Sequence, residues 1–489
     1  MKSLLSILLL CPFLQAGVAL ATSPNFVLIY TDDQGWLDTS VEMMSGRVDS
    51  KGKLCRTPNL ERLAGRGMTF SNGYACSPVC SSSRDSLLFG KTPARLHHSI
   101  LMGKARHDPS DWTIPRAIKA VHADYVCAHL GKWDSTPTPK AAGFDLGEAG
   151  SNGTGDDASP DNPKRIFSLA RKANEFIEKQ AKAGKPFYLR VSHYAIHNKH
   201  FARPETLRTY KEKGLDDRQA LRLAMIEDLD AGFGLLLDKL DSLGLSKSTF
   251  VIFTSDNGAQ GSNLPLRGGK AWAWEGGLRV PLIVSGPGVP KRSRCDLPVV
   301  GWDFLPTFFE LAGGDARNLP KELDGGSLAE VLRKGNKGKV SRGEQSLVFH
   351  YPWFVKVPMS SVRLGKHKLV RDLRSGTTRL FDLSKDIGES NDLTARLPEV
   401  SEDLKARLDK YLEEVGAETL KEVLEKNERE SLAKIEVWRA QADKLLSSLK
   451  DAPEAERKKR TTEAVSLEKR ILQQMDSIKR MRANRRTAW

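Results

Sequence analysis

Short apolar runs alternate, over the first two thirds of the chain, with longer stretches in which apolar residues recur at steps of three and four. The short runs are rich in Val, Ile, Phe and Tyr and lack strict alternation with polar residues, which is typical of strands that helices cover on both faces. The clearest helical pattern runs from about Arg218 to Leu243. The pattern therefore predicts an α/β fold with helices flanking a large mixed, mostly parallel sheet. The apolar runs lie at 26–30, 125–128, 187–191, 250–253 and 282–284.

The pattern changes at a linker rich in Gly, Lys and Arg at 335–343. Beyond it, two β-like stretches at 367–372 and 378–384 flank "RSGT" and predict a hairpin in a smaller C-terminal α+β domain. From Glu402 onward the pattern is almost wholly helical. Two amphipathic stripes meet near Pro453 and predict a helical hairpin or a short coiled coil.

The first residues have the pattern of a signal peptide, with a lysine, an apolar run at 4–10 and a small-x-small site that ends at Ala21. The apolar stretch is too short, and too interrupted by Pro12 and Gln15, to span a bilayer. We expect cleavage near Ala21, export of the mature protein to the periplasm or the medium, and no transmembrane segment. The expected units are the signal peptide at 1–21, a large domain at 22–340, a small α+β domain at 341–401 and a helical extension at 402–489.

Charge distinguishes the helical extension. The chain has a net charge of +15, and the segment from Arg457 to the end holds 11 Lys/Arg and 3 Asp/Glu. Such a segment fits a polyanion or an anionic surface, and equally well a solvated helix face. No recognition motif supports nucleic-acid binding, so we expect no such partner, whereas the apolar stripes would suit a homo-oligomer formed through the C-terminal helices.

Polar side chains follow four of the apolar runs, at the point where each run ends. In an open α/β sheet, ligands bind beyond the carboxyl ends of the strands, so these groups are expected to converge on one edge. The carboxylates and the amide are hard oxygen ligands, suited to calcium or magnesium rather than zinc, although Asp and Asn are also common turn residues. The groups are Asp32 and Asp33, Lys132, His193 and His197, and Asp256 and Asn257.

Cys80 opens the stretch "CSSSRDSLLF", in which serines in capping position precede an apolar helical run. The pattern places Cys80 near a helix N-terminus, which binds anions and lowers the pKa of a thiol. Arg84 lies four residues on, hence on the same helix face. An anionic-ester site is one interpretation; a disulfide with Cys76 or a buried thiol are the others. Beyond Cys11 the chain has five cysteines, so at least one thiol would stay unpaired.

Eight motifs, in order, resemble those of the type I sulfatases, the formylglycine-dependent arylsulfatase and N-acetylgalactosamine-6-sulfatase type of the alkaline phosphatase superfamily. The resemblance covers residues 25–393 and implies an alkaline phosphatase-like fold. Its maturation motif, Cys-x-Pro/Ala-x-Arg, matches Cys80 and Arg84. The motifs are "PNFVLIYTDDQGW", "TPNLERLAGRGMTFSNGYACSPVC", "CSSSRDSLLFGK", "GKW", "AMIEDLDAGFG", "TSDNGA", "GGKAWAWEGGLRVP" and "LFDLSKDIGESNDL".

The resemblance implies that a sulfatase-maturation enzyme oxidises Cys80 to formylglycine, whose hydrated form attacks sulfur and later expels the sulfate. Arg84 would stabilise that nucleophile, and His197 would protonate the leaving alcohol. Lysines would neutralise the sulfate oxygens, and the cation, calcium by family habit rather than magnesium, would polarise one of them. The matching catalytic positions are Cys80, Arg84, Lys132, His197 and Lys270, and the matching metal positions are Asp32, Asp33, Asp256 and Asn257.

The chain departs from the family pattern at Ser82, Phe89, Lys91, Asp134 and Lys199. The resemblance implies hydrolysis of sulfate esters, with a sulfated carbohydrate as substrate. Two alternatives stay open. One is a hydrolase of phosphate or phosphonate esters from the same superfamily, and the other is a catalytically silent protein that binds sulfated polysaccharide.

Overall fold

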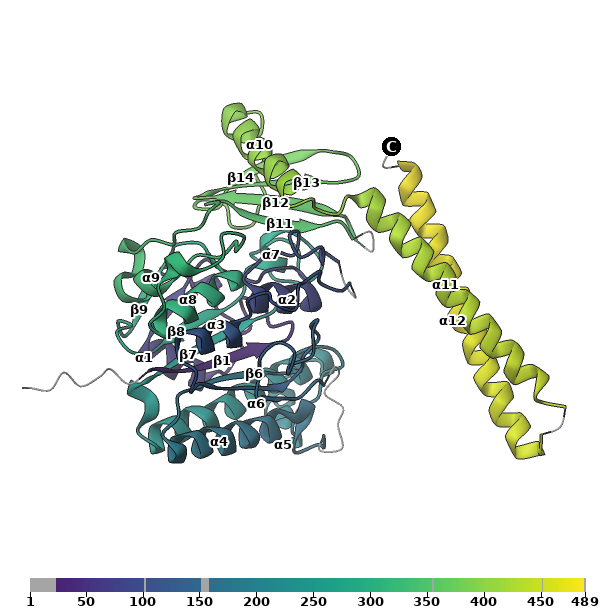
Figure 1. The fold of residues 1–489 in the computed structure, drawn as a ribbon, viewed down its shortest axis with the longest axis horizontal. Helices are drawn as coiled ribbons and strands as arrows, with labels where there is room; N and C mark the ends of the chain where they lie inside the picture. The colour runs from purple at the N-terminus through teal and green to yellow at the C-terminus, as the bar shows by residue number, and fades with distance from the viewer. Residues whose placement is uncertain (1–22, 101–102, 151–157, 354–355, 451, 488–489) are drawn as a thin grey trace, which may run out of the picture.

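The computed structural model describes residues 23–487, except 101–102, 151–157, 354–355 and 451. The predicted signal peptide lies outside the described residues. A layered α/β domain forms the body of the molecule, a small sheet lies against it, and two long helices project to one side (Figure 1).

The central sheet has eight strands in the order β5-β4-β6-β1-β7-β8-β2-β9. The run from β5 to β7 is parallel, and β8 pairs antiparallel with both β7 and β2, so the predicted mixed, mostly parallel sheet is confirmed. The strands are β1 (Asn25–Thr31), β2 (Met68–Phe70), β4 (Val126–Gly131), β5 (Leu146–Gly147), β6 (Phe187–Ser192), β7 (Thr249–Ser255), β8 (Leu282–Ser285) and β9 (Ser293–Cys295).

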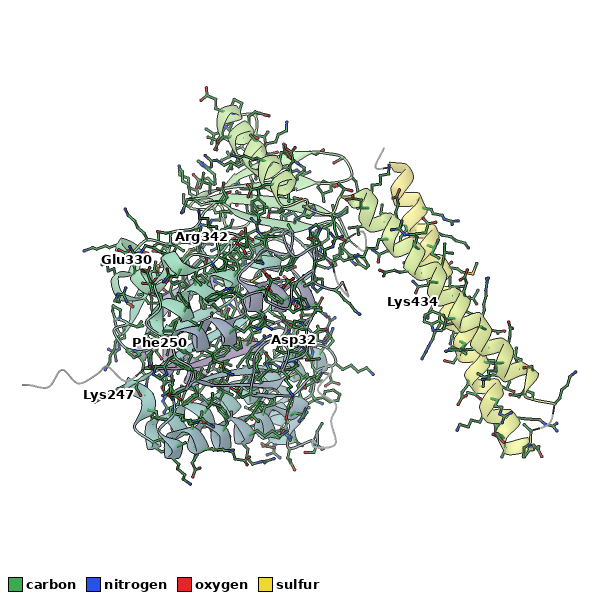
Figure 2. The ribbon with its side chains drawn as sticks, in the orientation of Figure 1. Asp32, Lys247, Phe250, Glu330, Arg342 and Lys434 are labelled. Carbon is green, nitrogen blue, oxygen red and sulfur yellow. The ribbon has the colours of Figure 1, made fainter. Side chains whose placement is uncertain are left out.

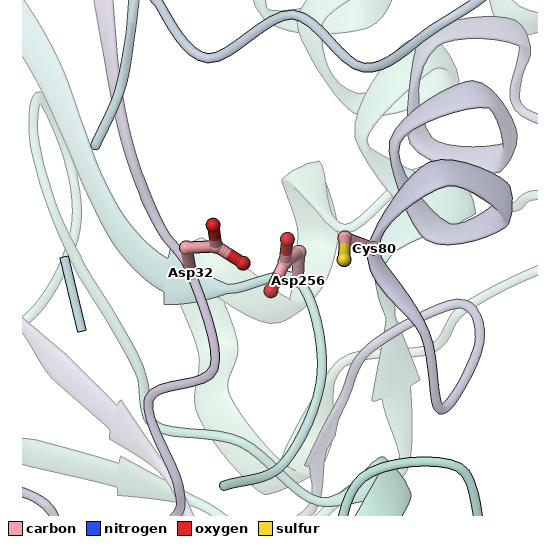
Figure 3. Close-up of side chains that lie close together, drawn as sticks. All are labelled: Asp32, Cys80 and Asp256. Carbon is pink, nitrogen blue, oxygen red and sulfur yellow. The ribbon is translucent and has the colours of Figure 1, made fainter. Parts of the chain in front are cut away.

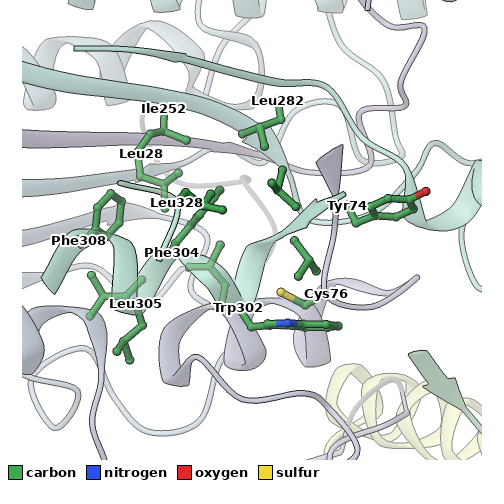
Figure 4. Packing of buried hydrophobic residues seen from close by; sticks show 14 of the residues in the cluster. Leu28, Tyr74, Cys76, Ile252, Leu282, Trp302, Phe304, Leu305, Phe308 and Leu328 are labelled. Atoms are coloured by element: carbon green, nitrogen blue, oxygen red, sulfur yellow. The ribbon is translucent and has the colours of Figure 1, made fainter. Parts of the chain in front are cut away.

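Helices cover both faces of this sheet, which explains why its strands are apolar throughout. Figure 4 shows one of the two cores, where Leu28 and Ile252 of the sheet meet Phe304 and Phe308. The other core lies between the opposite face and the helices α1, α4 and α6. The helices are α1 (Pro58–Arg66), α2 (Cys80–Phe89), α3 (Ile114–Val121), α4 (Ile166–Ala183), α5 (Pro204–Lys211), α6 (Asp217–Ser242), α7 (Glu275–Leu278), α8 (Phe304–Leu311) and α9 (Ala329–Lys334); β3 (Gly73–Tyr74) and β10 (Val299–Val300) form a separate short pair.

The smaller sheet is antiparallel and contains β11 (Leu347–Tyr351), β12 (Met359–Leu364), β13 (His367–Asp372) and β14 (Thr378–Asp382). The predicted hairpin around "RSGT" is the pair β13 and β14. The helix α10 (Pro398–Glu414) packs on this sheet through Leu404 and Leu408. We therefore group α10 with the small sheet rather than with the helical extension. The helical pattern of the sequence runs from α10 into the extension without a break.

The helical extension is an antiparallel hairpin of α11 (Leu420–Ser447) and α12 (Glu454–Thr487), which turns near Pro453. Its apolar seam includes Ile435 and Ile471. Figure 2 shows Lys434 on this hairpin, well apart from Asp32 in the body of the molecule. Among the described residues, no helix combines the length and apolar character needed to cross a membrane.

Candidate active site

Four neighbouring parallel strands, β4, β6, β1 and β7, end at one edge of the sheet, and each is followed directly by a polar residue. In spatial order these residues are Lys132, His193, Asp32 and Asp256. The register aligns the strand ends, since Gly131 pairs with Ser192, Tyr30 with Ser192 and Thr31 with Ser255. The sheet topology thus brings together side chains separated by more than 200 positions in the sequence.

Three buried oxygen atoms at this edge, one each from Asp32, Asp33 and Asn257, accept no hydrogen bond from the described residues. The partner oxygen of Asp32 accepts from the Lys132 ammonium at 2.7 Å, and that of Asp33 accepts from the Asn257 amide at 2.8 Å. Unpartnered buried oxygens are costly unless something binds them. Two carboxylate oxygens and an amide oxygen are the ligands that Ca²⁺ or Mg²⁺ prefers, so the residues fit a hard divalent cation.

Cys80 is the first residue of α2 and lies beside this oxygen cluster. Its sulfur and one carboxylate oxygen each of Asp32 and Asp256 lie within 4.8 Å of one another (Figure 3). The Lys270 ammonium lies 3.5 Å from the sulfur and 2.5 Å from Asp33. The helix ends at Gly90, whose φ of +65° suits glycine.

Two expectations about Cys80 are wrong. None of the serines caps α2, because Val79 precedes it and they lie within its first turn. The pKa of the thiol is not lowered but raised to about 12, chiefly because burial penalises the thiolate and because Asp32 adds a negative charge nearby, which Lys132 only partly offsets. An unmodified Cys80 is therefore a neutral thiol at pH 7.

Arg84 is wholly buried one helical turn beyond Cys80. Its guanidinium donates to Asp256 at 2.6 and 3.0 Å and to the Lys132 carbonyl oxygen at 3.1 Å. Burial alone would lower the pKa of Arg84, but the carboxylates of Asp256 and Asp32 raise it overall. Arg84 therefore stays charged and fixes the start of α2 relative to the ends of β4 and β7.

The two histidines after β6 differ in exposure. His193 is buried, and burial lowers its pKa to about 4, so it is neutral at pH 7. The side chain of His197 is 37% exposed, and its Nε2 lies 3.8 Å from Asp33. Its Nδ1 lies 2.7 Å from the Asn198 carbonyl oxygen, which leaves Nε2 facing the site. His197 is thus the histidine of the pair that reaches both the site and solvent.

The structure brings all nine sequence-predicted residues together, and it adds Lys356, which sequence reasoning missed. Lys356 follows β11 in the small domain and donates to the Lys270 carbonyl oxygen at 3.0 Å. Only the packing of the two domains creates this contact, so no local pattern signals it.

A buried ion cluster holds the small domain next to the loop that carries Lys270. Lys368 of β13 lies 2.9 Å from both Glu275 and Glu389, and Glu275 begins α7, five residues after Lys270. Arg279 and Tyr74 complete the contacts of Glu275.

Two departures from the family pattern have clear surroundings. Ser82 is buried and donates to the Ser77 hydroxyl at 2.7 Å. Asp134 lies 3.6 Å from the Lys132 ammonium and has a left-handed φ of +45°. None of the five cysteines after residue 22 forms a disulfide, including Cys76, which packs beside Trp302 (Figure 4).

Carboxylates, lysines and a cysteine gathered at the strand ends of such a sheet fit an esterase of the alkaline phosphatase type. The chain belongs to the sulfatase family: the family model described as "Sulfatase" matches residues 24–314, and the model for "N-sulphoglucosamine sulphohydrolase, C-terminal" matches residues 269–417. Members of this family are sulfuric ester hydrolases, and the protein is therefore such an enzyme.

Relatives and solved structures agree with this assignment. The chain is 28% identical over 444 residues to an "Ulvan-active sulfatase" of Formosa agariphila, covering 81% of this chain and 82% of the relative. It is 31% identical over 364 residues to the mouse "N-acetylgalactosamine-6-sulfatase", covering 64% and 66%. The structure "Ps i-CgsB in complex with k-i-k-neocarrahexaose" has the same fold, with a TM-score of 0.68, 24% identity and coverage of 80% and 93%.

Proposed function

We propose that the protein hydrolyses a sulfate ester of a sulfated carbohydrate, using formylglycine at position 80 and a bound Ca²⁺. The observation that carries this proposal is the position of the Cys80 sulfur, which lies 3.5 Å from the Lys270 ammonium and within 4.8 Å of a carboxylate oxygen each of Asp32 and Asp256. Relatives named for ulvan and for N-acetylgalactosamine 6-sulfate support a sugar substrate.

Each polar residue of the site has a proposed role. Hydrated formylglycine would supply the oxygen nucleophile, and the cation would be held by the metal residues. Lys132 and Lys270 would neutralise the sulfate oxygens as charge builds on them, because their ammonium groups already lie against the carboxylates that surround position 80. His197 would donate the proton that the leaving alcohol needs. The proposed metal residues are Asp32, Asp33, Asp256 and Asn257.

The modification is the first thing to test. Conversion replaces the sulfur and two hydrogens of Cys80 with one oxygen, a two-electron oxidation that needs a sulfatase-maturation enzyme and an external oxidant. Mass spectrometry of the tryptic peptide 67–84, from protein produced with such an enzyme, should find the aldehyde. A peptide that keeps its thiol in every preparation would remove the nucleophile and favour the silent polysaccharide-binding alternative.

A hydrolase of phosphate or phosphonate esters is the second candidate. A phosphonate monoester hydrolase of Agrobacterium radiobacter shares the fold, with a TM-score of 0.60 at 18% identity. Turnover of 4-nitrophenyl sulfate should exceed that of 4-nitrophenyl phosphate and of a matched phosphonate ester. The reverse order would favour the second candidate.

Export is part of the proposal, because the pattern of the first 21 residues is that of a signal peptide. Fractionation of producing cells, with N-terminal sequencing of the mature chain, should find a protein outside the cytoplasm that begins near residue 22. A chain that stays cytoplasmic with Met1 intact would contradict it.

The hairpin of α11 and α12 is the proposed contact between two copies of the protein. Several of its large apolar side chains are exposed, among them Val437, Val465 and Leu472. Light scattering should show a dimer or a larger assembly for residues 22–489 and a monomer for a variant that lacks residues 420–489. Equal masses per particle for both would contradict this role.

A further inference from the structure

Lys164 is a buried lysine that the proposed mechanism does not use. It lies just before α4, with a left-handed φ of +51° at Lys164 and +60° at Arg165. Only 5% of its surface is exposed, and its ammonium makes no hydrogen bond or ion pair with the described residues. The Nζ atom itself is not closed off from solvent, so an anion from outside can reach an ammonium that no described residue pairs.

The surroundings of Lys164 connect it to the active site. The charges of Asp32, Asp33 and Lys132 all act on its ammonium, so it lies within the electrostatic field of the proposed metal and sulfate residues. It therefore lies at the margin of the site, yet it contacts none of the carboxylates there. The carboxylates of Asp32 and Asp33 are already engaged by Lys132 and Lys270, respectively.

An aromatic residue of the loop after β6 lies beside this ammonium. The ring of Phe201 is 5.7 Å from it, measured to the ring centroid, and Phe201 is 47% exposed. His200 of the same loop is partly buried, which lowers its pKa; its imidazole donates to the Ile196 carbonyl oxygen, so the neutral ring has no N–H left for an anion. An ammonium without a partner among the described residues, next to an exposed aromatic ring, suits a sugar that carries an anionic substituent, because a sugar face packs on aromatic rings and the anion takes donors.

We propose that Lys164 and Phe201 form a subsite that binds a second anionic group, a sulfate or a carboxylate, of the sugar whose sulfate ester is cleaved. This inference rests on the proposed function and adds that the preferred substrate carries at least two anionic groups. Lys164 donates a hydrogen bond to the second group, while the ring of Phe201 packs on the sugar.

Binding of matched aryl sulfates tests the subsite without relying on turnover. The probes are 4-nitrophenyl sulfate and its derivatives with a carboxylate or a second sulfate at the ortho or meta position. Calorimetry on a Cys80→Ala background should show that at least one dianionic probe binds more tightly than the monoanion. The substitution Lys164→Met should weaken dianion binding by about tenfold to a hundredfold relative to the monoanion, which corresponds to one charge-assisted hydrogen bond.

Three further variants sharpen the test. Lys164→Arg should restore much of the preference, and Phe201→Ala, at a half-exposed position, should reduce it without disturbing the core. The control is Lys185→Met, which removes an exposed lysine before β6, at the opposite end of the strands, and should leave the ratio of dissociation constants unchanged.

The outcomes separate this inference from the proposed function. An unchanged ratio of dissociation constants in Lys164→Met and Phe201→Ala would overturn the subsite alone, provided that the matured enzyme hydrolyses 4-nitrophenyl sulfate. If the dianionic probes bind no better than the monoanion to the parent protein, the subsite is also wrong. Failure of every probe to bind, together with no turnover by protein that carries formylglycine, would overturn both. A preference for only the sulfate or only the carboxylate derivative would identify the second group.

Discussion

Replacement of Lys368 with methionine should destabilise the protein by about 3–5 kcal/mol, because it leaves a buried carboxylate without its cation. The Lys368 ammonium is fully buried and lies 2.9 Å from both Glu275 and Glu389. Glu275 keeps Arg279 at 2.7 Å after the substitution, whereas the Glu389 carboxylate keeps, among the described residues, only the backbone N–H of Glu275. Most of the loss therefore comes from Glu389.

The loss should depend on pH in a defined direction. Burial raises the pKa of Glu389 to about 7 even with Lys368 present, and the substitution removes the charge that opposes this rise. A carboxyl group whose pKa is higher in the folded state binds more protons when folded, so stability falls as pH rises through the interval between the unfolded and folded values. The penalty of Lys368→Met should therefore be smaller at pH 5.5 than at pH 8.

Urea unfolding followed by circular dichroism at these two pH values measures the effect. The double variant Lys368→Met/Glu389→Gln should recover much of the loss at pH 8, because it removes the unpaired charge. Lys366→Met is the matched control, since Lys366 is an exposed lysine two residues away whose ion pair with Asp382 is worth at most about 1 kcal/mol. A loss below about 1 kcal/mol for Lys368→Met, or a loss of equal size at both pH values, would refute the reasoning.

Four more results are expected. Arg190→Met should raise the unfolding free energy by about 1–3 kcal/mol, because the terminal nitrogens of this buried guanidinium have no partner in the described part of the chain. Methionine also fits between the rings of Tyr30 and Trp133. A fall in the unfolding free energy would mean that an anion or ordered water binds the guanidinium. Burial lowers the pKa of His193 to about 4, so the unfolded state binds more protons than the folded state between pH 6.5 and pH 4. Stability should therefore fall as the pH drops through this interval, and it should fall less steeply in His193→Leu. Asp33→Asn should weaken Ca²⁺ binding at least about tenfold by calorimetry, and an unchanged affinity would exclude it as a ligand. Deletion of residues 420–489 should leave kcat/KM for 4-nitrophenyl sulfate unchanged, and a large decrease would mean that the hairpin supports the site.

The strands and the edge at which the site lies were predictable because both depend on local signals. An apolar run of five residues followed by Asp-Asp or Asp-Asn indicates a buried strand and a polar strand end, and parallel strands bring such ends together.

The surroundings of Cys80 were not predictable from its position on a helix. The helix N-terminus favours a thiolate, but burial beside Asp32 opposes it more strongly, and burial is a property of the whole packed structure.

Lys164, Lys356 and Lys368 carried no sequence signal for a related reason. None of the three belongs to a recognisable motif, and a lysine is most often a solvated surface residue. Their significance comes from contacts with residues distant in the chain, such as the carbonyl oxygen of Lys270 for Lys356. The division between α10 and α11 carried no sequence signal, because one amphipathic helix that packs on a sheet and the next that packs on a helix have the same period.

The buried cluster around Lys368 also decides where the protein can be divided and recombined. A chimera cut at the linker near residue 340 would combine Glu275 of one sulfatase with Lys368 and Glu389 of another. Every donor would then have to match this charge pattern among fully buried side chains. A cut before Gly269 transfers all three residues together with Lys270, α7 and the small sheet. The C-terminal family model also begins at residue 269, so the exchangeable unit includes part of the active site as well as the small domain.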